Sequence, residues 1–258
     1  MAMKQARQAL GLTSKIGGVV RDVAVVIAIW LGVTTLAYAS YHIPSESMVP
    51  TLEVGDRLLV NKYVYGYSRY SMPFNPPLFD GRILKNAPER GDIAVFFVPK
   101  GAGPNIDEGT TYIKRVVGLP GDTVQVRNGR LVINATVVPR RALRTLDLVD
   151  RHGFPVRVTE YEETLPGGTS HRIYERSDRA RYDNTRTFRV PEDHYFMMGD
   201  NRDNSEDSRA PGGFTFVPAE QLIGRADVIS FSIADCDRLV DDRCAAGVPV
   251  GRFFRALN

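Results

Sequence analysis

Apolar and polar positions divide this chain of 258 residues into two parts. From Val23 to Ala39 it reads VAVVIAIWLGVTTLAYA, without a charge, and beyond it short apolar runs alternate with turn residues. An uncharged run of this length is near the lower limit for a helix that crosses a bilayer. The pattern therefore predicts a transmembrane anchor at residues 23–41, which separates an N-terminal tail at residues 1–22 from a larger domain at residues 42–258.

The charges before the apolar run predict its orientation. Four basic residues and one acid precede it, so the positive-inside rule keeps the tail in the cytoplasm and exports the larger domain. A cleavable signal peptide is the alternative, because residues 37–39 have the small-x-small pattern at which such peptides end. The charged residues are Lys4, Arg7, Lys15, Arg21 and Asp22.

The larger domain reads as a series of short β-strands. Asn128 and Gly129 predict a tight hairpin, because a two-residue type I′ turn needs positive φ at both positions. The sequence TLPGGTSHRIY predicts a second hairpin, inside a charged stretch at about 140–186 that we interpret as an insert. The fold class is therefore mainly β: one transmembrane helix, then an exported antiparallel β domain with an inserted β subdomain. The strand-like runs are DRLLVNKYVYG, GDIAVFFVP, TYIKRVVGL, DTVQVRNGRLVIN, HYFMMGD and ADVISFSI.

The segment YSMPFNPPLF, from Tyr70 to Phe79, combines aromatic residues with prolines and is not expected to form regular structure. It predicts an exposed apolar loop. Two interpretations stay open, a lid over part of the core and a loop that dips into the membrane surface.

Composition restricts the partners. Lys and Arg total 33 against 30 acids and the two signs are interspersed, so the sequence contains no basic patch for nucleic acid. Cys236 and Cys244 are close enough in sequence to form a disulfide, which requires an oxidising compartment. Two free thiols are the alternative.

The sequence offers no metal site and no histidine base. The four histidines are far apart, and HExxH is absent. The acidic stretch GDNRDNSEDSR does not fit a calcium loop counted from Asp200, because Arg202, Ser205 and Pro211 occupy positions that need other residues. His42 would lie on the opposite face of an extended strand from Ser47. We therefore expect neither a metal nor another cofactor.

Four motifs occur in a fixed order along the chain. The first, IPSESMVPTL (43–52), follows the apolar run; the second, YIKRVVGLPGD (112–122), lies on a strand; and the third, GDNRDNSEDSR (199–209), follows another strand. A fourth, RGD (90–92), opens a strand between the first and the second. Together they resemble the signature boxes of bacterial type I signal peptidases, serine proteases with a Ser/Lys dyad. The resemblance covers about 43–233, without the insert and the C-terminal tail.

The resemblance implies a function and a location. It implies a serine endopeptidase that cleaves N-terminal signal peptides from exported preproteins through an acyl-enzyme. We expect a single-pass protein of the bacterial inner membrane, with the tail in the cytoplasm and the catalytic domain in the periplasm. Its partners would be preprotein signal peptides and membrane lipid, and it would act as a monomer.

The resemblance also implies roles for individual residues. Ser47 matches the nucleophile and Lys114 its general base, while Ser45 matches the hydroxyl that completes the oxyanion hole with the backbone N–H of Ser47. Glu46 stands where many members carry glycine, and we expect it to point away from the groove. Further matches are Ser205, which orients the lysine; Asp207 and Arg209, a supporting ion pair; and Ile43, Pro44, Tyr112 and Ile113, which line the substrate groove.

Physical chemistry sets a condition on this dyad. A lysine can accept a proton only when neutral, which near neutral pH needs a pKa roughly 2 to 3 units below its ordinary value. On a strand, Lys114 shares a face with Tyr112 and Val116, which could desolvate it. Local sequence alone leaves open an exposed lysine and does not choose between Ser45 and Ser47 as nucleophile.

Three other functions stay open at this stage. One is a specialised relative with the same dyad that serves pilus or conjugation substrates, and another is a self-cleaving repressor with a Ser/Lys dyad. The third is an anchored β domain without enzymatic activity, in which the serines only form turns.

Overall fold

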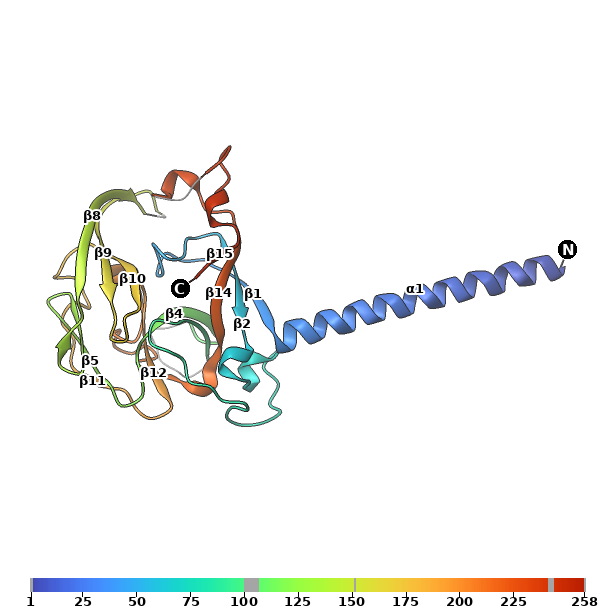
Figure 1. Ribbon diagram of the computed structural model, residues 1–258, viewed down its shortest axis with the longest axis horizontal. Helices are drawn as coiled ribbons and strands as arrows, with labels where there is room; N and C mark the ends of the chain where they lie inside the picture. Colours follow the sequence, from blue (N-terminus) through green and yellow to red (C-terminus); the bar gives the residue numbers. More distant parts are fainter. Residues whose placement is uncertain (1, 100–106, 151, 241–243, 258) are drawn as a thin grey trace.

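The computed structural model describes residues 2–99, 107–150, 152–240 and 244–257, without the side chains of residues 2–16, 34 and 35. One α-helix, α1 (Ala2–Leu36), projects from a body of β-strands (Figure 1). The predicted mainly β class is confirmed, because the described residues after Leu36 form only strands, short 3-10 helices and loops. The 3-10 helices are η1 (Tyr63–Tyr65), η2 (Arg69–Ser71), η3 (Arg202–Asn204), η4 (Ala219–Gln221), η5 (Cys236–Arg238) and η6 (Val250–Arg252).

Helix α1 ends before the boundary predicted for the anchor. Residues 38–42 form strand β1 (Tyr38–His42), which pairs along its whole length with β2 (Asp56–Asn61). The residues of β1 are alternately exposed and half-buried, as in a strand with one face on the core. Over the described residues, no helix is both long enough and apolar enough to cross a membrane. Helix α1 therefore ends before the predicted boundary at residue 41, and the anchor at residues 23–41 stays a prediction.

An antiparallel sheet of eight strands forms the centre of the body. Its order is β1-β2-β14-β3-β4-β12-β13, and β15 also pairs with β14. Strand β3 lies between β14 and β4, and its two faces pack into different core clusters, which explains why its run IAVFFV is apolar on both faces. The remaining strands of this sheet are β3 (Ile93–Val98), β4 (Thr110–Gly118), β12 (His194–Met198), β13 (Val217–Pro218), β14 (Leu222–Ser232) and β15 (Arg255–Ala256).

A three-stranded sheet occupies the range that the sequence suggested as an insert. It has the order β10-β9-β8 and consists of β8 (Arg140–Val149), β9 (Pro155–Thr164) and β10 (Ser170–Glu175). The predicted hairpin TLPGGTSHRIY is confirmed, because β9 pairs with β10 across two glycines of positive φ. In Figure 1 this sheet lies on the side of the body away from α1.

A third sheet, of four strands, contains the other predicted hairpin. Asn128 has φ 48° and Gly129 φ 69°, as a type I′ turn requires, and Arg127 pairs with Arg130 across it. The prediction is confirmed. The order is β11-β5-β6-β7, with β5 (Thr123–Arg127), β6 (Arg130–Ile133), β7 (Thr136–Val137) and β11 (Phe188–Arg189).

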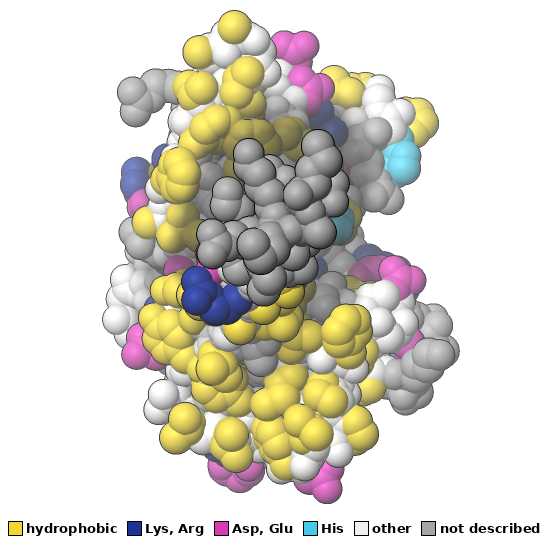
Figure 2. Space-filling view, turned by 90° about the vertical axis from the view of Figure 1, so that its right-hand side faces the viewer, with side chains coloured by type: hydrophobic (Ala, Val, Ile, Leu, Met, Phe, Trp, Pro, Cys, Tyr) yellow, Lys and Arg dark blue, Asp and Glu magenta, His cyan; other side chains and the backbone are white. Residues whose placement is uncertain are grey.

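Exposed apolar side chains gather on the face from which α1 projects (Figure 2). The segment at 70–79 contributes to this exposure in part: Tyr70 is buried and stacks on Phe97, whereas Phe74 and Leu78 are exposed. Tyr70 thus covers part of the core, whereas the side chains at the tip of the segment, Phe74 and Leu78, stay exposed. The large exposed apolar residues of α1 are Val19, Val20, Val23, Val25, Val26, Ile27, Ile29, Trp30, Leu31, Val33 and Leu36.

The C-terminal tail carries a disulfide. Cys236 and Cys244 are joined, which decides between the two alternatives that the sequence left open. The bridge closes a loop that begins at η5, beyond the end of β14.

Candidate active site

The loop between β1 and β2 carries Ser47 and is fixed by the apolar residues that follow it. Met48 and Leu52 are fully buried in the core formed with Leu58 and Ile93. Burial of a side chain of this size stabilises by about 1.5–3 kcal/mol. The backbone carbonyl of Ser47 also accepts a hydrogen bond of 3.1 Å from the backbone N–H of Asn201. The position of Ser47 is therefore set by packing and by the third motif.

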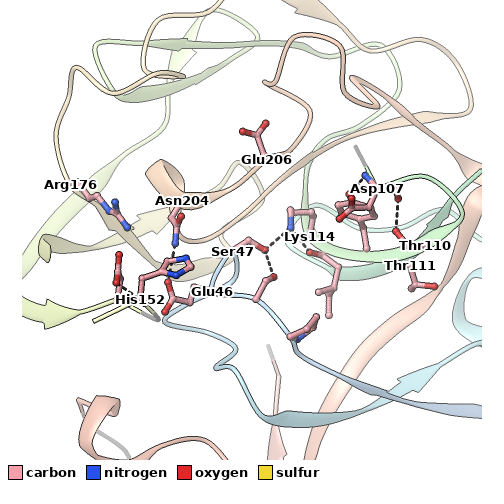
Figure 3. A pocket seen from close by; sticks show the side chains of 15 residues that line it. Glu46, Ser47, Asp107, Thr110, Thr111, Lys114, His152, Arg176, Asn204 and Glu206 are labelled. Carbon is pink, nitrogen blue, oxygen red and sulfur yellow. Dashed lines mark hydrogen bonds between the residues drawn. The ribbon is translucent and has the colours of Figure 1, made fainter. Parts of the chain in front are cut away.

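Lys114 reaches Ser47 from strand β4. Its Nζ donates to Ser47 Oγ at 2.7 Å and to the carbonyl oxygen of Ile113 at 3.0 Å (Figure 3). The Nζ also lies 5.8 Å from the centre of the Tyr112 ring. Lys114 is 3% exposed, and Ser47 is 9% exposed. The fold thus brings together the two residues that the sequence analysis paired.

Burial perturbs the titration of this amine. Desolvation lowers the pKa of Lys114 from 10.5 to about 8, because the charged form loses its water. The carboxylates of Asp207 and Asp200 act in the opposite direction, and the guanidinium of Arg209 adds to the lowering. At mildly alkaline pH the amine is largely neutral, and a neutral amine can take the proton of Ser47.

Ser45 lies beside Ser47 with its hydroxyl directed to the same place. The two hydroxyl oxygens are 3.4 Å apart, and either could be the donor. A hydroxyl and a backbone N–H that converge near a nucleophile can hold the negative oxygen of a tetrahedral intermediate. Ser45 is therefore positioned for the role that the resemblance implied.

Asp207 and Arg209 form a buried ion pair behind the dyad. Arg209 donates from Nε to Asp207 Oδ1 at 2.9 Å and from Nη2 to Oδ2 at 2.8 Å, and both side chains are almost completely buried. Asp207 Oδ2 also accepts from the backbone N–H of Gly199 at 2.9 Å. The pair closes the loop of the third motif onto the end of β12.

Ser205 lies next to the nucleophile loop without a bond of its own. Its Oγ is buried and has no hydrogen-bond partner among the described residues. Gly199 touches it: a Cβ at Gly199 would overlap Ser205 Oγ and the carbonyl oxygen of Ser47. A hydrogen bond from Ser205 to Lys114, which the resemblance implied, is not formed.

Residues to which the sequence analysis gave no role complete the support of the site. Asp200 forms a fully buried bidentate ion pair with Arg115, at 2.8 and 2.7 Å. Asn201 donates from Nδ2 to the carbonyl oxygen of Glu46 at 3.0 Å. The third motif contained Asp200 and Asn201 and the second contained Arg115, but only the fold shows that they meet.

A cleft of about 770 Å³ runs past the dyad. Three of the four residues expected in the groove, Pro44, Tyr112 and Ile113, line it. Ile43 does not line it, since this residue is 3% exposed and packs in the core, so its place in the groove stays a prediction. Its backbone is bonded to residues 55 and 56, which continues the pairing of β1 and turns the side chain inward.

The expectation that Glu46 points away from the groove is wrong. Its side chain lines the cleft instead of pointing away, and it binds Asn204 and Arg238. Figure 3 shows Ser47 near the middle of the cleft, with Lys114 on one side and Glu46 and Asn204 on the other. Beyond Asn204, the cleft is lined by Asp150, His152 and Arg176, which lie at the ends of insert strands.

Within the described residues, no group of His, Cys, Asp and Glu side chains is arranged to hold a metal ion. His42 is exposed at the end of β1, opposite Arg57. The cleft offers a serine hydroxyl, a desolvated lysine and a second hydroxyl.

Comparisons with known proteins point to one family. A family model described as signal peptidase, peptidase S26, matches residues 16–231. The protein named Signal peptidase I in Rickettsia typhi (strain ATCC VR-144 / Wilmington) is 40% identical over 215 residues, 80% of this chain and 77% of its own. Its namesake in Rickettsia conorii (strain ATCC VR-613 / Malish 7) is 39% identical over 217 residues, 81% and 77% of the two chains.

A crystal structure of a signal peptidase I from Enterococcus faecalis V583 also matches. Its sequence identity is 26% and the TM-score is 0.30, over 54% of this chain and 97% of that chain.

Proposed function

The chain belongs to the S26 family of signal peptidases, and from this premise we propose that it is a serine endopeptidase that removes signal peptides from exported preproteins. The observation that carries the proposal is the contact of 2.7 Å between Lys114 Nζ and Ser47 Oγ in a buried setting. A serine hydroxyl becomes an effective nucleophile only when a neighbouring base takes its proton.

The reaction proceeds in two stages. Neutral Lys114 takes the proton of Ser47 Oγ, which attacks the scissile carbonyl carbon and forms a tetrahedral intermediate. The Ser45 hydroxyl and the backbone N–H of Ser47 donate to its oxyanion. Protonated Lys114 then gives its proton to the leaving amine, and the peptide bond breaks to leave an acyl-enzyme on Ser47.

Hydrolysis of the acyl-enzyme repeats these steps with water. Lys114 takes a proton from the water, which attacks the ester carbonyl, and the proton returns to Ser47 Oγ when the ester bond breaks. Asp207 and Arg209 hold the loop at residues 199–209 in place and do not touch the substrate. We expect Ser205, whose Oγ has no hydrogen-bond partner among the described residues, to orient Lys114 during these steps.

Strand β4 offers an edge to the substrate. Strand β12 pairs with β4 only from Arg115 to Gly118, and the cleft is lined by residues 110–114. Among the described strands, none covers that edge on the β12 side, so an extended peptide can pair there as an added strand. We propose that Pro44, Tyr112 and Ile113 form shallow pockets that accept small residues such as Ala at the first and third positions before the cut.

Replacement of the dyad tests the proposal. Purified protein is incubated with a preprotein, and cleavage is followed by gel and mass spectrometry. Ser47→Ala and Lys114→Ala should abolish cleavage while circular dichroism shows an unchanged fold. Matched controls are Ser170→Ala and Lys85→Ala, at exposed positions that do not line the cleft, which should keep the activity. Retained cleavage in either dyad variant contradicts the mechanism, and an inactive wild type would favour a binding module.

We further propose that α1 holds the catalytic domain, residues 42–258, at the outer face of a bacterial inner membrane, with residues 1–22 in the cytoplasm. The many large apolar side chains that α1 exposes support this. The exposed tip of the segment at 70–79, with Phe74 and Leu78, would add contact with lipid. The disulfide supports an oxidising compartment such as the periplasm.

The membrane proposal has its own experiment. Carbonate extraction of cell membranes should leave the protein in the pellet, and sedimentation in detergent should give a monomer. Leu78→Asp should weaken binding of the protein to liposomes, whereas Val137→Asp, an exposed apolar position on β7, should not. Release by carbonate would contradict the anchor without affecting the proposed chemistry.

A further inference from the structure

The residue before the nucleophile is joined to the C-terminal tail by an ion pair. Arg238 Nη2 donates to Glu46 Oε1 and, at 3.2 Å, to the backbone carbonyl of Val149. The other carboxylate oxygen of Glu46 accepts from Asn204 Nδ2 at 3.1 Å. The side chain of Glu46 is 10% exposed and that of Arg238 is 32% exposed, so the carboxylate is largely withdrawn from water.

Arg238 is held in place by the tail itself. It is the last residue of η5, which begins at the disulfide residue Cys236. The carboxylate of Asp235 caps this turn by accepting from the backbone N–H of Asp237 at 3.1 Å, and the backbone N–H of Arg238 bonds to the Asp235 carbonyl. The guanidinium is thus presented from a closed turn rather than from a free end.

The backbone on both sides of the Glu46–Ser47 peptide is also fixed. The carbonyl oxygen of Glu46 accepts from Asn201 Nδ2 at 3.0 Å and from the Val49 N–H at 3.2 Å, and the Ser47 carbonyl accepts from the Asn201 N–H. The contacts of the Glu46 side chain also restrain this short segment. Because Glu46 lies between Ser45 and Ser47 in the sequence, a displacement of its carboxylate also shifts the oxyanion hydroxyl of Ser45 and the nucleophile.

We propose that Arg238 is a positioning residue of this peptidase, which acts through the Glu46 carboxylate to hold Ser45 and Ser47 in the geometry for attack. This inference rests on the proposed function. Arg238 has no contact with the dyad itself; its effect passes through one ion pair. Small displacements of reacting groups have large effects on rate, so a pair of modest stabilising energy can still control turnover.

An ion pair at the rim that contributes only stability is the competing explanation. Exposed pairs of that kind usually contribute little. Here the carboxylate binds two donors from separate parts of the chain, Asn204 in the third motif and Arg238 in the tail, and it is adjacent in sequence to the nucleophile. The two explanations differ in whether kcat or the melting temperature changes.

The test uses the full chain in detergent and a synthetic peptide with Ala at the first and third positions before the cut. Arg238→Gln and Glu46→Gln should each lower kcat about tenfold with KM nearly unchanged. The double variant should be no slower than either single variant, because both remove the same contact. The charge-reversed pair, Glu46→Arg with Arg238→Glu, should recover part of kcat, as should Arg238→Lys alone.

Controls separate this inference from the function on which it rests. Arg141→Gln removes an exposed ion pair of the insert and should leave kcat unchanged. A wild type with no more turnover than Ser47→Ala overturns the proposed function. An active wild type with unchanged kcat in Arg238→Gln, or with losses that add in the double variant, overturns the positioning role. A fall in melting temperature without a fall in kcat does so as well.

Discussion

Lys114 Nζ lies 2.7 Å from Ser47 Oγ, in a position where both side chains are shielded from bulk water. Because burial lowers the pKa of Lys114 to about 8, the neutral amine becomes the main form only at mildly alkaline pH. We predict that kcat/KM rises about tenfold per pH unit below this value and levels off above it. Initial rates on a synthetic peptide across the pH range measure this. A flat profile would contradict the assignment of Lys114 as base.

The same shift predicts a pH dependence of stability. Folded Lys114 binds its proton more weakly than in the unfolded chain, where its pKa is 10.5. Between about pH 8 and pH 10.5 the unfolded state therefore holds more protons, and the free energy of unfolding rises with pH. Below this window both states are protonated and the cost of burying the charge is constant.

A substitution isolates this effect. Relative to Lys114→Met, the wild type should gain about 3 kcal/mol in free energy of unfolding across the window. Urea unfolding of both proteins at its two ends measures the gain. A difference that does not change with pH would mean that the amine is solvated.

Ser205→Ala separates an orienting role from a structural one. Since Ser205 Oγ has no hydrogen-bond partner among the described residues, its removal should change the free energy of unfolding by less than about 0.5 kcal/mol. We expect kcat/KM to fall at least about tenfold, because the hydroxyl orients Lys114 once substrate is bound. Denaturant unfolding and peptide kinetics give the two values. Full activity in Ser205→Ala would remove this residue from the mechanism.

Gly199→Ala should disable the site through contact alone. The added methyl would overlap the Ser205 side chain and the carbonyl oxygen of Ser47, and a backbone oxygen cannot turn away as a flexible side chain can. We expect a loss of about 1–3 kcal/mol in stability and a large loss of kcat. Gly18→Ala is the matched control, since nothing lies within 4 Å of the new methyl. Equal activity of the two variants would contradict the close packing at Gly199.

Asp207→Asn should change stability and pH dependence in a defined direction. It leaves the buried Arg209 cation without its partner, which typically costs about 3–5 kcal/mol. Asp207 also raises the pKa of Lys114, so its loss should lower that pKa further and move the rising limb of the pH–rate profile to lower pH. Calorimetry and the pH profile are the measurements. A limb that moves to higher pH would contradict the sign of this interaction.

Local sequence patterns predicted much of the fold. Asn128–Gly129 predicted its hairpin because the turn depends on two adjacent residues, and the run GDIAVFFVP predicted the strand found as β3. Strand β1 could not be predicted, because residues 38–41 are uncharged and continue the apolar run, whereas their pairing with β2 depends on a segment further along the chain.

The identity of the dyad residues was predictable from the motifs, but the contacts of site residues with distant parts of the chain were not. Ser47 and Lys114 lay in recognisable boxes, but the burial of Ile43 could not be predicted, because its orientation depends on backbone bonds to residues 55 and 56. Glu46 was misplaced for a related reason: its partner Arg238 is 192 residues away and outside every motif. Neither periodicity nor resemblance contains information on such a contact.

Strand β1 has a consequence for how substrates are reached. It has five residues, a span of roughly 17 Å, and it pairs along its whole length with β2 between the end of α1 and the loop of Ser47. The loop that carries the nucleophile is thus joined to α1 by a paired strand and not by a flexible linker. With α1 in the membrane, as we propose, we expect the cleft to lie at a set distance from the bilayer and to select substrates by the distance of their scissile bond from it.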